Sequence, residues 1–198
     1  MSLALSNCRT IGDRYGDCDE TTRIVTPYLQ RRRIAVARAH IKRRVIDVGC
    51  HIGPLADSVS ADRYVGLDID GTLLAEARRT HRLHRFVGAH EIKPEEQCDT
   101  LVSLAVIEQV PGPQEWLERW VRHVAPDGRV VVATPHARWD PLHGVAANVR
   151  LTSSQAHDEH ESVLDRDSLE RPVGAVGLKL VKYRRFLAGM DRVLVTER

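Results

Sequence analysis

From about Arg44 onward, short apolar runs alternate with longer segments of mixed apolar and polar residues. Apolar runs of about 4–8 residues are typical of buried strands, whereas apolar residues three or four positions apart are typical of helices. Such alternation predicts an α/β fold, in which helices cover both faces of a parallel sheet. The predicted elements are strand 44–49, helix 54–60, strand 63–68, helix 72–81, strands 84–88 and 99–104, helix 113–124 and strand 129–134.

The two ends of the chain depart from this alternation. We expect a helix near 167–176 and a closing hairpin of two strands, near 179–185 and 192–196, joined through Ala188-Gly189. Residues 1 to about 26 lack sustained periodicity, and Pro27 is expected to open a basic helix. The chain of 198 residues has the size of one α/β domain. Its expected parts are an N-terminal arm and basic helix (1–43), a cofactor-binding core (44–134), a polar substrate-loop insert (135–164) and a C-terminal helix and hairpin (165–198).

The run 45–55, VIDVGCHIGPL, followed by 64–70, YVGLDID, indicates a nucleoside-binding crevice. A buried strand ends at Gly49, the chain turns through glycines, and Asp68 closes the next strand about 20 residues later. An acid at that tip is suited to accept hydrogen bonds from the two ribose hydroxyls.

The loop lacks the G-x-G-x-x-G pattern that cradles a pyrophosphate. His51 stands at the second glycine position and Pro54, which has no N–H to offer an oxygen, stands at the third. S-adenosylmethionine carries a ribose and an adenine but no phosphate, so it fits this loop better than a dinucleotide.

Together with 99–111, DTLVSLAVIEQVP, and 124–136, VAPDGRVVVATPH, these residues resemble the class I S-adenosylmethionine-dependent methyltransferases. The resemblance is to the compact group with ubiquinone-type and small-molecule O-methyltransferases, and it extends from Arg44 to the C-terminus. The family pattern after the fourth strand usually ends in Glu-His-Val-Pro, and Gln109 replaces that histidine. The resemblance implies a Rossmann-like, seven-stranded, mostly parallel sheet with an antiparallel last strand.

The resemblance also implies roles for residues around the loop. Asp47 would hold the methionine amino group, directly or through water, and Ile69 would pack against adenine. Ala89 stands where the family often has an acid for the adenine amino group, so backbone or His90 must substitute. The expected cofactor-binding residues are Asp47, Gly49, Cys50, His51, Gly53, Asp68, Ile69, Ala89, His90, Ser103 and Leu104.

Methyl transfer from a sulfonium depends mainly on holding the acceptor in line, and a base is useful only when the nucleophile is protonated. His136, at the tip of the fifth strand, and His160, in the insert, are the candidate catalytic residues. The alternative for each is a histidine without a catalytic role, either hydrogen-bonded within the protein or exposed to solvent. We expect no metal, although His157 and His160 have helical spacing beside acids.

Composition narrows the cellular setting. No apolar stretch approaches a membrane span, and no secretory signal is visible. The four cysteines lie far apart without C-x-x-C spacing, so we expect reduced thiols and a cytoplasmic location. Arginines cluster at 31–33 and lysine and arginines at 42–44, but a net charge of only +2 and few aromatics favour a solvated helix face over a nucleic-acid surface.

The sequence thus predicts S-adenosylmethionine-dependent methyl transfer to an oxygen or nitrogen of a small-molecule acceptor. Two alternatives stay open: an RNA methyltransferase that uses the basic helix, and a catalytically silent binding module with this fold, supported by His51 and Ala89. The acceptor and the oligomeric state are left open.

Overall fold

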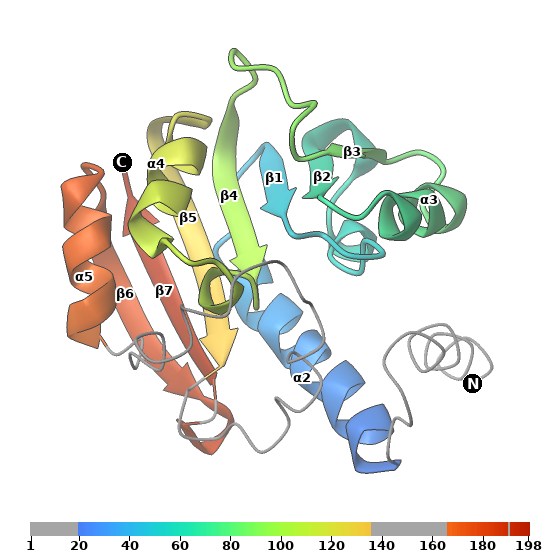
Figure 1. Ribbon diagram of the computed structural model, residues 1–198, viewed down its shortest axis with the longest axis horizontal. Coiled ribbons are helices and arrows are strands. Elements are labelled where there is room, and N and C mark those ends of the chain that lie inside the picture. Colours follow the sequence, from blue (N-terminus) through green and yellow to red (C-terminus); the bar gives the residue numbers. More distant parts are fainter. Residues whose placement is uncertain (1–19, 136–165, 190) are drawn as a thin grey trace.

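The computed structural model describes residues 20–135, 166–189 and 191–198 (Figure 1). The first nineteen residues of the predicted arm and nearly all of the predicted insert lie outside these residues. His136 and His160, the two candidate catalytic residues, therefore also lie outside them.

A seven-stranded sheet with strand order β3-β2-β1-β4-β5-β7-β6 forms the centre of the protein (Figure 1). The first five strands pair in parallel, whereas β7 is antiparallel to both β5 and β6, as predicted. The strands are β1 Val45–Val48, β2 Tyr64–Asp68, β3 Arg85–Gly88, β4 Cys98–Leu104, β5 Val124–Pro135, β6 Lys179–Phe186 and β7 Asp191–Glu197. The α-helices are α2 Glu20–Arg38, α3 Gly71–Thr80, α4 Pro113–Val121 and α5 Arg166–Ala175.

Each face of the sheet has its own apolar core, because side chains alternate between the two faces along every strand. Ile46 of β1 belongs to the core beneath α4 and α5, which includes Trp120 and Val173. Val45 belongs to the opposite core, beneath α2 and α3. The predicted Rossmann-like architecture, with helices on both faces, is confirmed.

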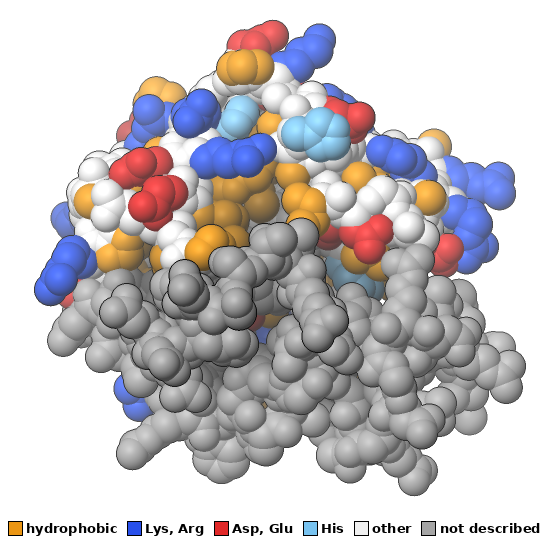
Figure 2. Space-filling model, viewed as in Figure 1, with side chains coloured by type: hydrophobic (Ala, Val, Ile, Leu, Met, Phe, Trp, Pro, Cys, Tyr) orange, Lys and Arg blue, Asp and Glu red, His pale blue; other side chains and the backbone are white. Residues whose placement is uncertain are grey.

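Coverage of the α4 and α5 face is uneven. α4 packs on β5 and α5 on β6, whereas the connection 89–97 between β3 and β4 contains no helix. Figure 2 shows hydrophobic side chains gathered in a hollow of this face, between the part that holds α4 and the part that holds β2 and β3. Among the described residues, no helix is long and apolar enough to cross a membrane.

Several predicted elements differ from the structure, and the helix predicted over 113–124 ends at Val121. The expected helix 54–60 is a single 3-10 turn, Ala56–Ser58, because Val59 returns to an extended conformation and is buried with Leu55. The basic helix begins at Glu20, and Pro27 lies inside it. The proline removes one helical hydrogen bond, and packing of the later turns, such as buried Ala37, offsets that loss. β5 begins at Val124, five positions before the predicted 129, because Val124 already pairs with Cys98.

The smallest residue of β2 is enclosed by the side chains that support the first loop. A Cβ added at Gly66 would lie 2.6 Å from Phe86 Cδ1 and 2.9 Å from Cys50 Sγ. Phe86 is itself held by an edge-to-face contact with Tyr64, at 5.7 Å between ring centroids. The space between β2, β3 and the loop is therefore filled.

We predict that Gly66→Ala lowers the free energy of unfolding by about 1–3 kcal/mol, because the added methyl overpacks this space. Gly71→Ala, at the first residue of α3, is the matched control, since a Cβ there meets nothing within 4 Å. It should leave stability unchanged or raise it by up to about 1 kcal/mol. Urea unfolding of both variants measures the difference, and equal losses would contradict the packing argument.

Candidate functional site

The turn that follows β1 is tied to β2 by its backbone. Gly49 has a φ of +77°, and the amides of Gly49 and Cys50 both donate to the carbonyl of Leu67, at 2.8 and 2.9 Å. A Cβ at Gly49 would lie 2.3 Å from Cγ2 of Val106, just beyond β4. Only glycine fits this conformation and this space, and the turn therefore joins the tips of three neighbouring strands.

Asp68 stands at the tip of β2, beside this turn. Its Oδ2 accepts from the backbone N–H of His51 at 2.8 Å and its Oδ1 accepts from that of Asp70 at 3.0 Å. Asp70 caps α3 by accepting from the amides of Thr72 and Leu73, so Asp68 is not the helix cap. A carboxylate offers about four lone-pair positions, and two remain on Asp68 for further donors. The side chain of Ile69, next in sequence, is 82% exposed.

Asp47 is a buried carboxyl group on β1. The hydroxyl of Tyr64 donates to its Oδ2 at 2.7 Å. Burial raises the pKa of Asp47 to about 7, and the nearby charge of Asp68 adds to this effect while the Tyr64 bond opposes it. Asp47 thus has a partner within the protein, which the sequence did not reveal.

The loop between β1 and the 3-10 turn holds two unusual side chains. His51 has a φ of +53°, and its Nδ1 is buried without a hydrogen-bond partner among the described residues. Burial lowers the pKa of His51, while the charges of Asp68 and Asp70 oppose that shift. Burial also raises the pKa of the Cys50 thiol far above its usual range, which leaves Cys50 as an inert apolar filler.

An acid that the sequence analysis missed lies at the tip of β3. Gly88 pairs in register with Asp68, and the carboxylate of Glu91 accepts from the Gly88 amide at 2.6 Å. Ala89 is buried and donates its own amide to the carbonyl of Asp68 at 2.9 Å, whereas His90 is exposed. The sequence offered one signal for it: Glu91 stands two positions after Ala89, where the family often has an acid, and its side chain reaches back to the strand.

The tip of β4 contributes a second missed acid. Glu108 lies in the 3-10 turn Ile107–Gln109, and its Oε2 accepts from the hydroxyl of Thr134 on β5 at 2.9 Å. Burial raises the pKa of Glu108. Gln109, in the place of the expected histidine, donates to the carbonyl of Ala105 at 2.6 Å, where φ is +58°.

Ser103 and Leu104 of β4 point to opposite faces of the sheet, as neighbours in a strand do. Ser103 pairs with Val132 of the α4 and α5 core, and its hydroxyl is buried without a partner among the described residues. Leu104 packs against the opposite core, on the side of Asp47 and Tyr64. Ser103 and Leu104 therefore do not both face the same side of the crevice.

The basic face of α2 was expected to be solvated, but one of its arginines forms an ion pair within the protein. The Nε and Nη2 atoms of Arg33 donate to the two oxygens of Asp191 at 3.0 and 2.9 Å, and Asp191 is 1% exposed. This bidentate pair fastens α2 to the start of β7. Arg31 and Arg32, by contrast, are exposed.

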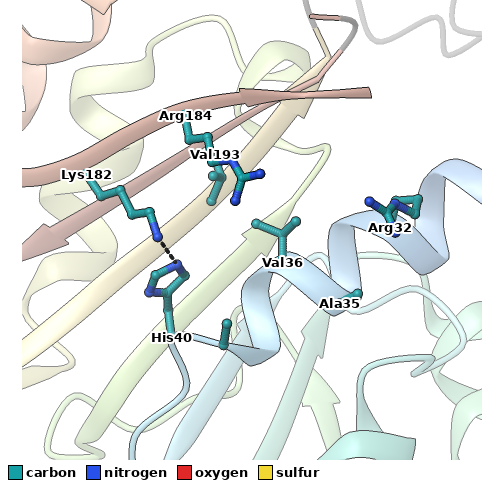
Figure 3. A pocket seen from close by; sticks show the side chains of 8 residues that line it. Arg32, Ala35, Val36, His40, Lys182, Arg184 and Val193 are labelled. Atoms are coloured by element: carbon teal, nitrogen blue, oxygen red, sulfur yellow. Dashed lines mark hydrogen bonds between the residues drawn. The ribbon is translucent and has the colours of Figure 1, made fainter. Parts of the chain in front are cut away.

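A hollow of about 250 Å³ lies between α2 and the β6–β7 hairpin (Figure 3). Its charged side chains are basic, and the Nζ of Lys182 lies 3.5 Å from Nε2 of His40 (Figure 3). Burial and the charges of Lys182 and Arg129 lower the pKa of His40. None of the expected cofactor-binding residues lines this hollow, which is formed by Arg32, Ala35, Val36, Ala39, His40, Lys182, Arg184 and Val193.

The strand order thus gathers most of the expected cofactor residues at one place. Asp47, Asp68 and the loop from Gly49 are close together, and the amide of Ala89 joins them through Asp68. Within the described ranges, no group of three or more His, Cys, Asp or Glu side chains has the arrangement of a metal site.

Comparison with known proteins identifies the family to which the chain belongs. A family model described as a methyltransferase domain matches residues 18–183. The chain is 31% identical over 175 residues to trans-aconitate 2-methyltransferase of Streptomyces coelicolor, covering 76% of this chain and 57% of that protein. It is 29% identical over 104 residues to ubiquinone biosynthesis O-methyltransferase of Bradyrhizobium diazoefficiens, covering 48% and 41%.

The fold is shared with solved structures at lower identity. Magnesium protoporphyrin IX methyltransferase from Synechocystis PCC 6803, solved with bound S-adenosylmethionine, has a TM-score of 0.65 at 15% identity. That match covers 100% of this chain and 92% of the other. The chain spans about half the length of the curated relatives first matched, at 51–57% of each. Because the family model matches most of its length, the chain belongs to the methyltransferase domain family, and it shares the fold of a structure solved with bound S-adenosylmethionine.

Proposed function

We propose that this protein transfers the methyl group of S-adenosylmethionine to a small-molecule acceptor. The observation that carries the proposal is the left-handed turn at Gly49, which sets the carboxylate of Asp68 beside the end of β1 with two acceptor positions free. Two hydroxyls spaced like those of a ribose match this carboxylate. Ile69, largely exposed next to it, is placed to pack against a flat base.

The loop suits a cofactor without phosphate. Pro54 has no amide hydrogen, and the segment after it is one 3-10 turn rather than an α-helix. The row of free amides and the dipole that hold a pyrophosphate at a helix N-terminus are therefore missing from this loop. We assign the adenine amino group to the tip of β3, where the carboxylate of Glu91 lies.

Asp47 is the proposed partner of the cofactor's ammonium group. A buried carboxylate without a cation is costly, and Asp47 carries this cost in the form of a pKa raised to about 7. A cationic group near it would favour the charged form. The alternative is a purely structural role, in which the bond to Tyr64 fixes β1 against β2.

The residues of the site bind and orient rather than react. Bound S-adenosylmethionine supplies an electrophilic methyl group, so this chain's task is to hold an acceptor atom in line with it and to exclude water. A base is required only for a protonated acceptor, and His136 and His160 remain our proposed candidates for it. Glu108 is a further, half-buried carboxyl group between the tips of β4 and β5.

The relatives named above support a small-molecule acceptor, since their names refer to trans-aconitate and to ubiquinone biosynthesis. An RNA acceptor is not favoured.

Cys50 and Cys98 are free, buried thiols, the form that cysteines keep in a reducing compartment. We therefore also propose a cytoplasmic location, and we keep the single-domain division of residues 1–198 as a proposal.

The test of the cofactor assignment is calorimetric titration with S-adenosylmethionine and S-adenosylhomocysteine, with NAD as the negative ligand. We expect micromolar affinity for the first two and none for NAD. Asp68→Ala should weaken binding by roughly 1–3 kcal/mol, and Asp68→Asn, which keeps one acceptor oxygen, by less. Asp62→Ala, at an exposed position before β2, serves as the control. Unchanged affinity in Asp68→Ala would remove the ribose assignment.

Asp47 should give stability a characteristic pH dependence. Its pKa is raised from 3.8 to about 7 in the folded protein, so between these values the unfolded chain is ionised while the folded protein keeps the proton. The contribution of Asp47 to folding stability therefore falls as pH rises from about 4 to about 7 and is constant above that. Relative to the parent protein, Asp47→Asn should gain up to roughly 4 kcal/mol across this window, at about 1.4 kcal/mol per pKa unit. Urea unfolding at a series of pH values measures this gap, and a gap independent of pH would refute the buried neutral acid.

His51 should be tolerated rather than required. Its positive φ is one that glycine adopts without strain, so His51→Gly is expected to bind S-adenosylhomocysteine as well as the parent or better. Gly49→Ala, in the same loop, should lose binding because its Cβ collides with Val106. Loss of affinity in His51→Gly would instead make the imidazole a ligand in its own right.

A further inference from the structure

Strand β7 buries a charged side chain that is not among the expected cofactor-binding residues. Arg192 is 0% exposed, and its Nε, Nη1 and Nη2 atoms have no hydrogen-bond partner among the described residues. A guanidinium group does not lose its proton in proteins, so it cannot escape the cost of burial by becoming neutral. An unpaired buried ion of this kind costs several kcal/mol.

The nearby acids are occupied elsewhere. Asp191 points to the opposite face of the sheet from its neighbour Arg192 and accepts hydrogen bonds from Nε and Nη2 of Arg33. Glu108 accepts from Thr134. Within the described ranges, Arg192 forms no ion pair with either carboxylate.

The register places Arg192 at the end of the sheet where ligands of α/β proteins bind. It pairs with Thr134, near the carboxyl end of β5, and β5 lies next to the tip of β4. Gly49 and Asp68 stand at the same end. Arg192 is three strands from β1 in the sheet order, which is about 14 Å at the usual strand spacing. A small acceptor can therefore reach from this strand toward the cofactor crevice.

A second polar group on the same face lacks a partner. Tyr183 of β6 pairs with Leu194, two residues from Arg192, and its buried hydroxyl has no hydrogen-bond partner among the described residues. A guanidinium fork and a hydroxyl together offer donors and no fixed negative charge. This combination suits a carboxylate, which accepts two parallel N–H bonds from one guanidinium.

We propose that Arg192 anchors a carboxylate of the methyl acceptor, and that the acceptor is a small organic acid. The inference rests on the proposed methyl transfer and narrows its substrate class. The anchored carboxylate supplies the negative charge that Arg192 lacks among the described residues. Its binding offsets the cost of burying the guanidinium.

The first arm of the test is the stability of the ligand-free protein. If the guanidinium is an uncompensated buried charge, Arg192→Met should raise the melting temperature, by about 2–4 °C or more. Arg184→Met, on the adjacent strand at an exposed position, is the matched control and should leave it unchanged. A lower melting temperature in Arg192→Met alone would show that the guanidinium has a structural partner, and would overturn the proposal.

The second arm is ligand binding to protein saturated with S-adenosylhomocysteine. The probes are benzoate, fumarate and trans-aconitate, each compared with its uncharged methyl ester and with sulfate at equal ionic strength. At least one acid should raise the melting temperature of the parent protein by roughly 5–10 °C at about 100 times its Kd. Its ester and sulfate should not, and the acid's affinity should fall at least about tenfold in Arg192→Met but not in Arg184→Met.

No effect of any acid on the parent protein, an equal effect of sulfate, or an equal response in Arg192→Met would each refute the anchor. The two proposals fail separately. Arg192→Met should keep its affinity for S-adenosylhomocysteine within about twofold, because the residue lies outside the cofactor loop. If the parent protein does not bind S-adenosylhomocysteine at all, methyl transfer fails, whereas the ligand-free stability arm still tests the buried charge.

Discussion

The left-handed turn at Gly49 ties the end of β1 to the end of β2, and the geometry of the candidate site depends on it. One carbonyl, that of Leu67, accepts two successive amides of the turn, and the next amide reaches Asp68. Because β1 lies between β2 and β4, a turn at this point contacts both neighbours, through Asp68 on one side and Val106 on the other. A side chain at Gly49 would disrupt all three strand tips at once.

Ionisable groups that cost stability gather at this same end of the sheet. Asp47 is a buried and Glu108 a half-buried carboxyl group, both with raised pKa values, and Arg192 is a buried guanidinium. Arg33 and Asp191, by contrast, form an ion pair with each other. Clustered groups of this kind are more typical of functional sites than of structural cores, because their cost is recovered when a ligand binds.

The departures from the family pattern are accommodated locally. His51 adopts the positive φ of the glycine it replaces, Glu91 brings a carboxylate to the strand tip where Ala89 has none, and Gln109 closes the turn at Ala105. These contacts weaken the case for a silent module, which depended on His51 and Ala89. The chain still matches only about half of the trans-aconitate methyltransferases' length, so its acceptor must be argued from its own residues.

The sequence by itself determined the order of the elements, the fold class and the loop residues from Gly49 to Asp68. These follow from local properties: apolar periodicity, the conformational freedom of glycine, and the spacing of an acid after a second strand. The sequence-based prediction was wrong where contacts with residues distant in the sequence determine the local structure. The 3-10 turn at Ala56–Ser58 and the extension of the basic helix through Pro27 depend on packing against the sheet.

Only the tertiary structure decided the partners of the charged residues. Tyr64 against Asp47, Thr134 against Glu108 and Asp191 against Arg33 are 17, 26 and 158 residues apart in the chain. The sequence shows that such groups exist, but burial and pairing are set by strand order and register. For the same reason, no local pattern reveals that Arg192, one arginine among many, is the one buried without a partner among the described residues. Its surroundings are made by strands that meet only in the folded sheet.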